Sequence, residues 1–263
     1  MTVAEGFLYN DIPYLRVGQG PPLVSIVGLT PEHDIPTGVE RRVALARARA
    51  LADHFTVYVV NRRRGLQPGE SMSSIAGHLA GAIEHDLGEP VLLDGTSTGG
   101  SVALQLAMDQ PGLVRRLVVI SSAYTLGPGR ALQAEMARLI RAGQPAEAWA
   151  SVITAMMPGA LRRPARPLSR LIARPMVPAD PSDVLVTLDA EDAFDVGDRL
   201  PEITAPTLVI GGTNDPFYTP DLFLRTASGV QDGRAHLFPG WGHGRASGSS
   251  ATTHLMLGFL LAH

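Results

Sequence analysis

The sequence predicts a three-layer α/β fold, in which a mostly parallel eight-stranded sheet lies between two layers of helices and a helical cap is inserted late in the chain. Three observations carry this prediction. Short apolar stretches, β-branched or leucine-rich, alternate with helix-like stretches along most of the chain. Most of these apolar stretches are continuous, as in parallel strands covered on both faces. This alternation of strand-like and helix-like stretches stops over one long segment rich in Ala, Arg, Pro and Met.

The expected strands and helices follow in chain order. The opening segment, residues 5–20, favours a hairpin that adds two antiparallel strands at one edge of the sheet. Six further strands are expected at 21–29, 55–60, 90–94, 114–122, 206–212 and 234–240. Helices are expected at 38–55, 73–88, 99–112, 219–230 and 249–263. Alternation of this kind implies right-handed crossovers between parallel strands.

The segment that follows Ala123 is predicted to be a helical insertion. It contains no strand-like stretch, prolines interrupt it repeatedly, and apolar helical runs occur at residues 131–140 and 148–157. Such runs argue against disorder. We therefore expect two parts, an α/β core formed by residues 1–123 and 200–263 and a helical cap formed by residues 124–199.

The composition is that of a folded domain with a sizeable core. The chain has 263 residues, of which 45% are hydrophobic, and a formal net charge of −3. This charge argues against nucleic acid or an anionic membrane as the main partner. The chain contains no cysteine, which excludes disulfides, cysteine metal ligands and a thiol nucleophile. We see no signal peptide and no apolar run that would span a bilayer, so we expect a cytoplasmic protein.

A serine surrounded by glycines stands between a predicted strand and the helix that follows it. Residues 95–99 are Gly-Thr-Ser-Thr-Gly, which matches G-x-S-x-G with Ser97 at its centre. In this motif a sharp turn holds the serine in a strained conformation with its hydroxyl exposed, and side chains at Gly95 and Gly99 would collide across the turn. Gly100 would let the helix pack close to a neighbouring strand. The pattern predicts a nucleophile at Ser97, with a plain glycine-rich turn as the alternative.

Together with four other segments in the same chain order, this motif resembles the α/β-hydrolase fold superfamily over nearly the full length. Residues 27–30 stand where the family carries its His-Gly oxyanion loop, and residues 59–71 resemble its Asp-x-Arg-Gly-x-Gly-x-Ser segment. Residues 192–220 resemble the segment leading to the catalytic acid, and residues 240–244 resemble the loop of the catalytic histidine. The resemblance implies a Ser-His-acid triad. Since epoxide hydrolases and haloalkane dehalogenases of this fold have aspartate at the nucleophile position, Ser97 argues against both.

In this family the triad follows the chain order serine, acid, histidine. His243 is the expected base, because it lies in a glycine-rich loop between the last strand and the last helix, and His33 is the alternative. Asp215 is the expected acid, because it follows the strand at 206–212 and would hold the imidazole in one tautomer. Three aspartates are alternatives by proximity: Asp192, Asp195 and Asp198.

The resemblance also implies an oxyanion hole made by the backbone amides of Leu29 and Thr98. The family histidine before Gly28 is replaced by Val27, which keeps the backbone donors but changes what fixes the loop. The candidate substrate contacts are Thr30, His33, Trp149 and Met156. No nucleotide-binding or metal-binding motif is present, so we expect no cofactor and no metal. The expected partner is a small apolar acyl substrate, and the sequence leaves a homodimer open.

Charged residues near the expected site carry less definite predictions. Asp94 stands where the family usually has an apolar residue, and we expect it to accept hydrogen bonds from backbone amides at the strand end, with a role in tuning the site as the alternative. Arg62, Arg63 and Arg64 follow a strand, and we expect solvated salt bridges on the scaffold, with contact to a substrate carboxylate as the alternative.

These residues predict a serine hydrolase that cleaves an ester, lactone or thioester of a small apolar substrate through an acyl-enzyme. Two alternatives stay open. The same triad could hydrolyse a C–C bond or catalyse a lyase or cyclase step on a polyketide-like substrate, and the fold could also serve a ligand-binding protein without turnover. Substrate choice depends on how the cap packs, which the sequence does not determine.

Overall fold

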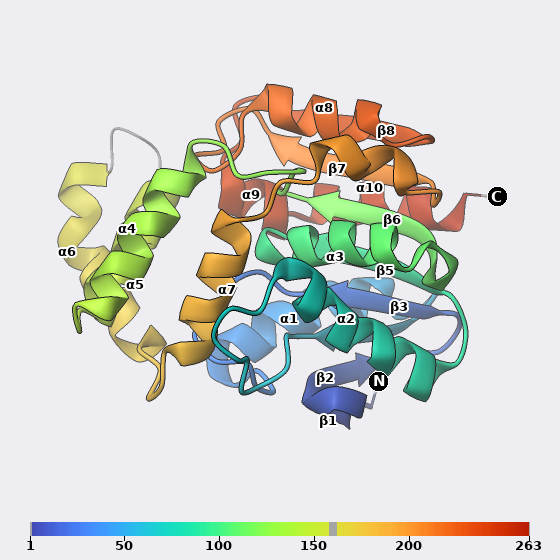
Figure 1. The fold of residues 1–263 in the computed structure, drawn as a ribbon, viewed down its shortest axis with the longest axis horizontal. Coiled ribbons are helices and arrows are strands. Elements are labelled where there is room, and N and C mark those ends of the chain that lie inside the picture. Colours follow the sequence, from blue (N-terminus) through green and yellow to red (C-terminus); the bar gives the residue numbers. More distant parts are fainter. Residues whose placement is uncertain (1, 158–161, 263) are drawn as a thin grey trace.

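The centre of the molecule is one sheet of eight strands in the order β1-β2-β4-β3-β5-β6-β7-β8 (Figure 1). The computed structural model describes residues 2–157 and 162–262. β1 pairs antiparallel with β2, β2 pairs antiparallel with β4, and all other neighbours are parallel. The strands are Ala4–Leu8 (β1), Ile12–Val17 (β2), Pro22–Ile26 (β3), Thr56–Val60 (β4), Val91–Thr96 (β5), Val114–Ile120 (β6), Thr207–Gly212 (β7) and Gly233–Phe238 (β8). The mostly parallel eight-stranded sheet and its edge hairpin are therefore confirmed.

Helices cover both faces of this sheet, which is why its inner strands are continuously apolar. All residues of β3 and β7 are buried, whereas the edge strand β8 has no buried residue. Apolar side chains of α2, α3 and α8 pack on one face, and those of α1 and α10 pack on the other. These helices are Gly38–Leu51 (α1), Met72–Ala82 (α2), Thr98–Asp109 (α3), Pro220–Gly229 (α8) and Ser250–Leu261 (α10). The two hydrophobic clusters make the sheet the middle of three layers.

Short helical turns complete the core. α2 runs directly into a π-helical turn at Ile83–Leu87, which ends at Gly88 with a φ of 65°. One 3₁₀ turn, Tyr9–Asp11, connects β1 to β2, and another, Pro111–Leu113, lies between α3 and β6. A short helix, α9, covers His243–Gly248. The expected glycine-rich loop is therefore shorter than the sequence suggested, since His243 is the first residue of a helix.

Between β6 and β7 the described residues form four α-helices, and none of these residues joins the sheet. The helices are Gly129–Arg141 (α4), Pro145–Met156 (α5), Arg162–Ala173 (α6) and Ser182–Asp192 (α7), with 3₁₀ turns at Arg174–Met176 and Gly197–Glu202. α7 lies between the sheet and the helices α4, α5 and α6, which extend away from the core (Figure 1). A separate hydrophobic cluster around Trp149 and Met136 holds this group of helices together. We call these four helices the helical insertion.

Candidate active site

Ser97 lies in the sharp turn between β5 and α3, in a backbone conformation that residues other than glycine rarely adopt. Its φ is 54° and its ψ is −127°, and its side chain is only half-buried. A Cβ atom on Gly95 would collide with the carbonyl oxygen of Gly99, and a Cβ atom on Gly99 would collide with the carbonyl oxygens of Ile26 and Val27. The glycines are therefore required by the close packing of the turn, as the motif predicts, and the serine itself carries the strain.

Asp215 and His243 form a buried pair on the segments that follow β7 and β8. Asp215 Oδ2 lies 2.8 Å from Nδ1 of His243, and the two side chains are 0% and 5% exposed. Asp215 Oδ1 accepts hydrogen bonds from the backbone amides of Phe217, at 2.8 Å, and Tyr218, at 3.3 Å. With three donors around it, the carboxylate is fixed in place and holds the imidazole through Nδ1, which directs Nε2 away from it.

Ser97 and His243 are both bonded to the end of β6. The Ser97 amide donates to the carbonyl of Ile120 at 2.8 Å, and the buried hydroxyl of Ser121 donates to the carbonyl of His243 at 3.5 Å. Among the described residues no hydrogen bond joins the Ser97 hydroxyl to the imidazole. The structure thus brings Asp215 and His243 into contact and places Ser97 at the same edge of the sheet, where β5, β6, β7 and β8 end side by side.

Two aromatic rings confine the imidazole of His243. The Phe217 ring lies at a centroid distance of 4.7 Å, and the Tyr218 ring stacks on the imidazole at 6.3 Å with an interplanar angle of 16°. Burial raises the pKa of the Tyr218 phenol well above its usual value, with the carboxylate of Glu191 adding to the effect, so this ring is neutral at ordinary pH. The imidazole is therefore held by packing as well as by its bond to Asp215.

The amides of Leu29 and Thr98, the two expected oxyanion donors, have no hydrogen-bond acceptor among the described residues. Thr98 is the first residue of α3, where an unpaired amide and the helix dipole both favour negative charge. The loop after β3 lies against the turn, because a Cβ atom on Gly28 would approach Cβ of Ser97 to 3.4 Å. Unpaired N–H groups on two segments beside a serine are what an oxyanion hole requires.

A buried arginine fixes the loop after β3. Arg62 is 3% exposed and donates to the carbonyls of Gly28, at 2.9 Å, and Val27, at 3.4 Å. Burial lowers the pKa of Arg62 to about 10, so its guanidinium keeps its charge at neutral pH. The expectation of a solvated salt bridge is wrong for this residue. Arg62 supplies the contact to the loop that Val27, in place of the family histidine, does not.

Arg63 and Arg64 differ from Arg62, since both lie toward the surface. Arg64 pairs with Asp34 at 3.2 Å and stacks over the ring of Phe7 at 4.5 Å, as expected of a scaffold salt bridge. Arg63 Nε donates to the carbonyl of Arg64 at 3.2 Å. Within the described part of the chain, no hydrogen bond or ion pair joins either residue to the turn that carries Ser97.

His33 is buried next to Arg62 and has no nitrogen left for a substrate. Its side chain is 0% exposed, Nε2 accepts from Arg62 Nε at 3.1 Å, and Nδ1 donates to the carbonyl of Arg63 at 3.0 Å. Burial, together with the charge of Arg62, lowers the pKa of His33 to about 3, although Asp183 lies 3.8 Å from Nδ1. This corrects two expectations, His33 as the alternative base and His33 as a substrate contact.

A buried glutamate that the sequence analysis did not select lies against the first turn of α3. Glu191, on α7, is 0% exposed and accepts hydrogen bonds from the hydroxyls of Thr98, at 2.8 Å, and Ser101, at 3.0 Å. It also accepts from Gln133 Nε2 at 3.0 Å. Its signal in the sequence is weak, because it is one of several acidic residues at the end of a predicted helical segment. Only the packing of α7 on α3 distinguishes it.

The other candidate substrate contacts have different environments. The hydroxyl of Thr30 donates to the carbonyl of Glu32 at 2.9 Å and accepts from Asn61, so it is used within the loop. Trp149 is 3% exposed in the cluster of the helical insertion, against which Leu29 packs. Met156 is 39% exposed, and its terminal methyl lies near the residue after His243, 3.8 Å from where a Cβ atom on Gly244 would be. Of the four, Met156 is the most exposed side chain.

Asp94 is paired with an arginine of α1, the helix that packs on the opposite face of the sheet from α3. It is 0% exposed, and Oδ1 lies 2.6 Å from Nη2 of Arg47 on α1. Burial raises the pKa of Asp94, while the Arg47 guanidinium acts in the opposite direction. The expected set of backbone-amide donors is wrong, because the partner is a side chain 47 positions away. The pair belongs to the scaffold that supports the turn carrying Ser97.

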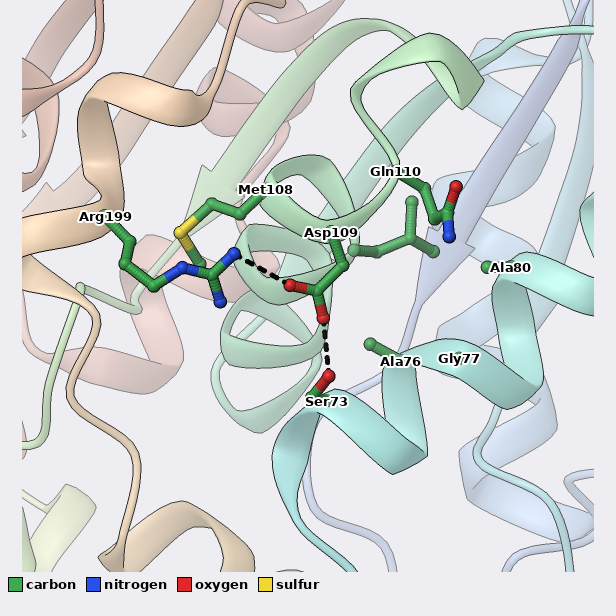
Figure 2. Close-up of a pocket in the computed structure, with 9 residues that line it drawn as sticks. Ser73, Ala76, Gly77, Ala80, Met108, Asp109, Gln110 and Arg199 are labelled. Carbon is green, nitrogen blue, oxygen red and sulfur yellow. Dashed lines mark hydrogen bonds and ion pairs between the residues drawn. The ribbon is translucent and has the colours of Figure 1, made fainter.

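A groove on the surface of the core lies away from Ser97. It has a volume of about 410 Å³ and runs between α2 and the C-terminal end of α3, where Arg199 and Ser73 both bond to Asp109 (Figure 2). Ser97 precedes the other end of α3. The groove therefore adds nothing to the site around Ser97.

In the described part of the chain, no group of His, Asp and Glu side chains could hold a metal ion, and no helix is long and apolar enough to cross a membrane.

The comparisons with known proteins agree on the fold and the family. The model of the "Alpha/beta hydrolase family" matches residues 34–251. The chain is 32% identical over 158 residues, 57% of its length, to a provisionally assigned carbamate hydrolase, RutD, of Variovorax paradoxus (strain S110), and 49% identical over 49 residues, 19% of its length, to a 2-hydroxy-6-oxononadienedioate/2-hydroxy-6-oxononatrienedioate hydrolase of Cupriavidus pinatubonensis. These matches span 58% and 17% of the two relatives.

Among solved structures, the enol-lactonase of Burkholderia xenovorans LB400 superposes with a TM-score of 0.80 over 98% of this chain and 100% of that one, at 19% identity. The family model covers most of the chain. The chain belongs to the alpha/beta hydrolase family of enzymes.

Proposed function

We propose that the protein is a serine hydrolase that cleaves an ester, lactone or thioester of a small apolar substrate through an acyl-enzyme. One observation carries the proposal: a strained serine after β5 and a buried Asp–His pair after β7 and β8 lie at the same edge of the sheet. A serine hydroxyl is a poor nucleophile until a base removes its proton. Ser97, His243 and Asp215 supply the nucleophile, the base and the acid that such a reaction needs.

In the proposed reaction the Ser97 hydroxyl attacks the substrate carbonyl while Nε2 of His243 takes its proton. Asp215, bonded to Nδ1, stabilises the imidazolium that forms. The amides of Leu29 and Thr98 donate to the developing oxyanion. The imidazolium then protonates the leaving alcohol or thiol, and a water molecule, activated by the same imidazole, releases the acyl group and restores the serine.

Contacts of the helical insertion support its role as the cap over this site, with the core formed by residues 1–123 and 200–263 and the cap by residues 124–199. Leu29 packs against the insertion's hydrophobic cluster, and Glu191 bonds to Thr98 next to the serine. The exposed Met156 near Gly244 adds an apolar, adaptable side chain beside His243. These contacts favour a small apolar acyl group as the substrate.

The direct test is turnover of p-nitrophenyl acetate and labelling by a fluorophosphonate. Wild-type protein should hydrolyse the ester and react with the fluorophosphonate at Ser97, whereas Ser97→Ala should do neither while keeping its melting temperature. Ser73→Ala, which removes a hydroxyl from the distant groove, is the matched control and should behave as wild type. Ester turnover by Ser97→Ala near the wild-type rate would overturn the assignment.

C–C bond hydrolysis is the second candidate, favoured by the local match to the 2-hydroxy-6-oxononadienedioate/2-hydroxy-6-oxononatrienedioate hydrolase. The same serine, histidine and aspartate would serve it. Comparing kcat/KM for a 2-hydroxy-6-keto dienoate with kcat/KM for matched esters and lactones decides between the two. A preference for the dienoate would replace the ester assignment while leaving the triad in place.

A further inference from the structure

The Glu191 carboxylate joins the helical insertion to the turn that carries the proposed nucleophile. It is fully buried, and its three donors come from two other helices, Thr98 and Ser101 on α3 and Gln133 on α4. None of the ion pairs among the described residues includes Glu191, so its direct partners are neutral donors, while its charge acts at longer range on the Arg62 guanidinium, whose pKa it raises. A buried carboxylate without a direct cation is costly to fold and needs a complete set of hydrogen bonds.

The other end of α7 is also fixed to the core. Asp183, in its first turn, accepts hydrogen bonds from the amides of Gly65, at 3.0 Å, and Leu66, at 2.8 Å. Glu191 makes its contacts in the last turn of the same helix. Because α7 is held to the core at both ends, the core contributes to fixing the Glu191 carboxylate, together with Gln133 of α4. It provides a fixed point against which α3 can be oriented.

The two hydroxyls that donate to Glu191 both lie in the first turn of α3, which follows Ser97 directly. Thr98 supplies the amide of the proposed oxyanion hole, and Ser101 lies one turn later, where its amide bonds back to the carbonyl of Ser97. Fixing both hydroxyls fixes the first turn of α3 against rotation. We propose that Glu191 is a positioning residue, which aims the Thr98 amide through these two hydroxyls; the inference rests on the proposed serine hydrolase function.

We expect Glu191 to contribute position to the reaction, and not charge. A carboxylate close to the oxyanion hole repels the negative charge that develops there, so its charge opposes the reaction. Glutamine at this position keeps the length and one carbonyl acceptor, and its amide can donate to the Ser101 hydroxyl. Glu191→Gln should therefore keep kcat within about threefold of wild type, whereas Glu191→Ala should lower it.

The decisive variant is Thr98→Val, which removes the hydroxyl and preserves the shape and the backbone amide. With p-nitrophenyl acetate we expect kcat to fall on the order of 10-fold to 100-fold, with KM changed far less, because the amide contacts the oxyanion mainly in the transition state. Thr98→Ser should restore most of the rate. Thr187→Val is the matched control, since Thr187 is a buried threonine on α7 whose hydroxyl, among the described residues, donates within its own helix to the carbonyl of Asp183.

Melting temperatures are measured for all variants so that a loss of rate in a folded protein can be separated from unfolding. Thr98→Val with the kcat of Thr187→Val would overturn the inference while leaving the serine hydrolase standing. A kcat for Glu191→Gln as low as that for Glu191→Ala would also overturn it, because charge would then be essential. A wild-type protein that neither hydrolyses the ester nor reacts with the fluorophosphonate would overturn the proposed function, and this inference with it.

Discussion

His243 and His33 are both buried and both follow strands of the same sheet, yet their ring nitrogens meet opposite charges. His243, after β8, has the carboxylate of Asp215 at Nδ1. His33, after β3, has a carbonyl at Nδ1 and the guanidinium of Arg62 at Nε2. The ring of His243 therefore faces an anion, whereas the ring of His33 faces a cation, and burial together with that cation lowers the pKa of His33 to about 3.

The difference shows that burial near a nucleophile does not identify a base. A base must gain a proton during the reaction and release it again, so it needs a partner that tolerates its charge. In the loop after β3, the same residue type is a neutral connector that fixes Arg62, which in turn fixes Gly28 and Val27.

Removing the imidazole of His243 should have the largest effect. We expect His243→Ala to lower kcat on the order of 10⁴-fold to 10⁶-fold, and the double variant with Ser97→Ala to be no slower than either single variant, because serine and histidine act as one unit. Rates with p-nitrophenyl acetate measure both. His254→Ala removes an exposed histidine from α10 and is the control. If the double variant were much slower than both single variants, the two residues would act separately and the contrast with His33 would lose its meaning.

Replacing the carboxylate that faces His243 should have the next largest effect. Asp215→Asn keeps the shape and the acceptor for the amides of Phe217 and Tyr218 but lets the histidine adopt the wrong tautomer. We expect kcat to fall by roughly 10²-fold to 10⁴-fold with a nearly unchanged melting temperature. Unchanged turnover in a folded Asp215→Asn protein would remove the distinction between the two histidines.

The sequence predicted the elements of the sheet and the turn at Ser97 because their signals are local. Continuous apolar strands, the glycines around Ser97 and the aspartate after β7 each depend on a few adjacent residues. The pairing of Asp215 with His243 also agrees with the order of the motifs along the chain. These are the parts of the site that the backbone itself determines.

The contacts that fix the site could not be predicted, because they join residues far apart in the chain. Arg62 and His33 are 29 positions apart, Glu191 and Thr98 are 93, and Arg47 and Asp94 are 47. In each case a charged residue that would ordinarily be solvated is buried by packing between elements, and no local pattern marks this. Long-range polar contacts of this kind depend on the packed structure as a whole.

A second buried carboxylate sharpens the contrast. Asp94 is paired with Arg47 in the scaffold below the turn that carries Ser97, so Asp94→Asn should change stability and leave the rate almost unchanged. We expect a loss of roughly 1–3 kcal/mol in the free energy of unfolding, because the asparagine carbonyl still accepts from Arg47. Urea denaturation and kcat, measured side by side with Asp215→Asn, separate the two roles. A dead but folded Asp94→Asn protein, beside an active Asp215→Asn protein, would reverse the assignment of the triad acid.

The last test concerns His33 and the pH dependence of stability. In the folded protein His33 stays neutral down to a pKa of about 3, whereas in the unfolded chain its pKa is near its ordinary value of 6.5. Between these two values the unfolded state binds the extra proton, so His33 lowers stability as the pH falls through that window and has no such effect above it. We expect wild type to lose up to about 1.4 kcal/mol per pH unit more than His33→Gln, whose amide can keep both hydrogen bonds. Urea denaturation from pH 7.5 to pH 4.5 measures the difference, with His254→Gln as the exposed control. Parallel stability curves for wild type and His33→Gln would show that the fold does not hold His33 neutral. The contrast drawn between His33 and His243 would then be wrong.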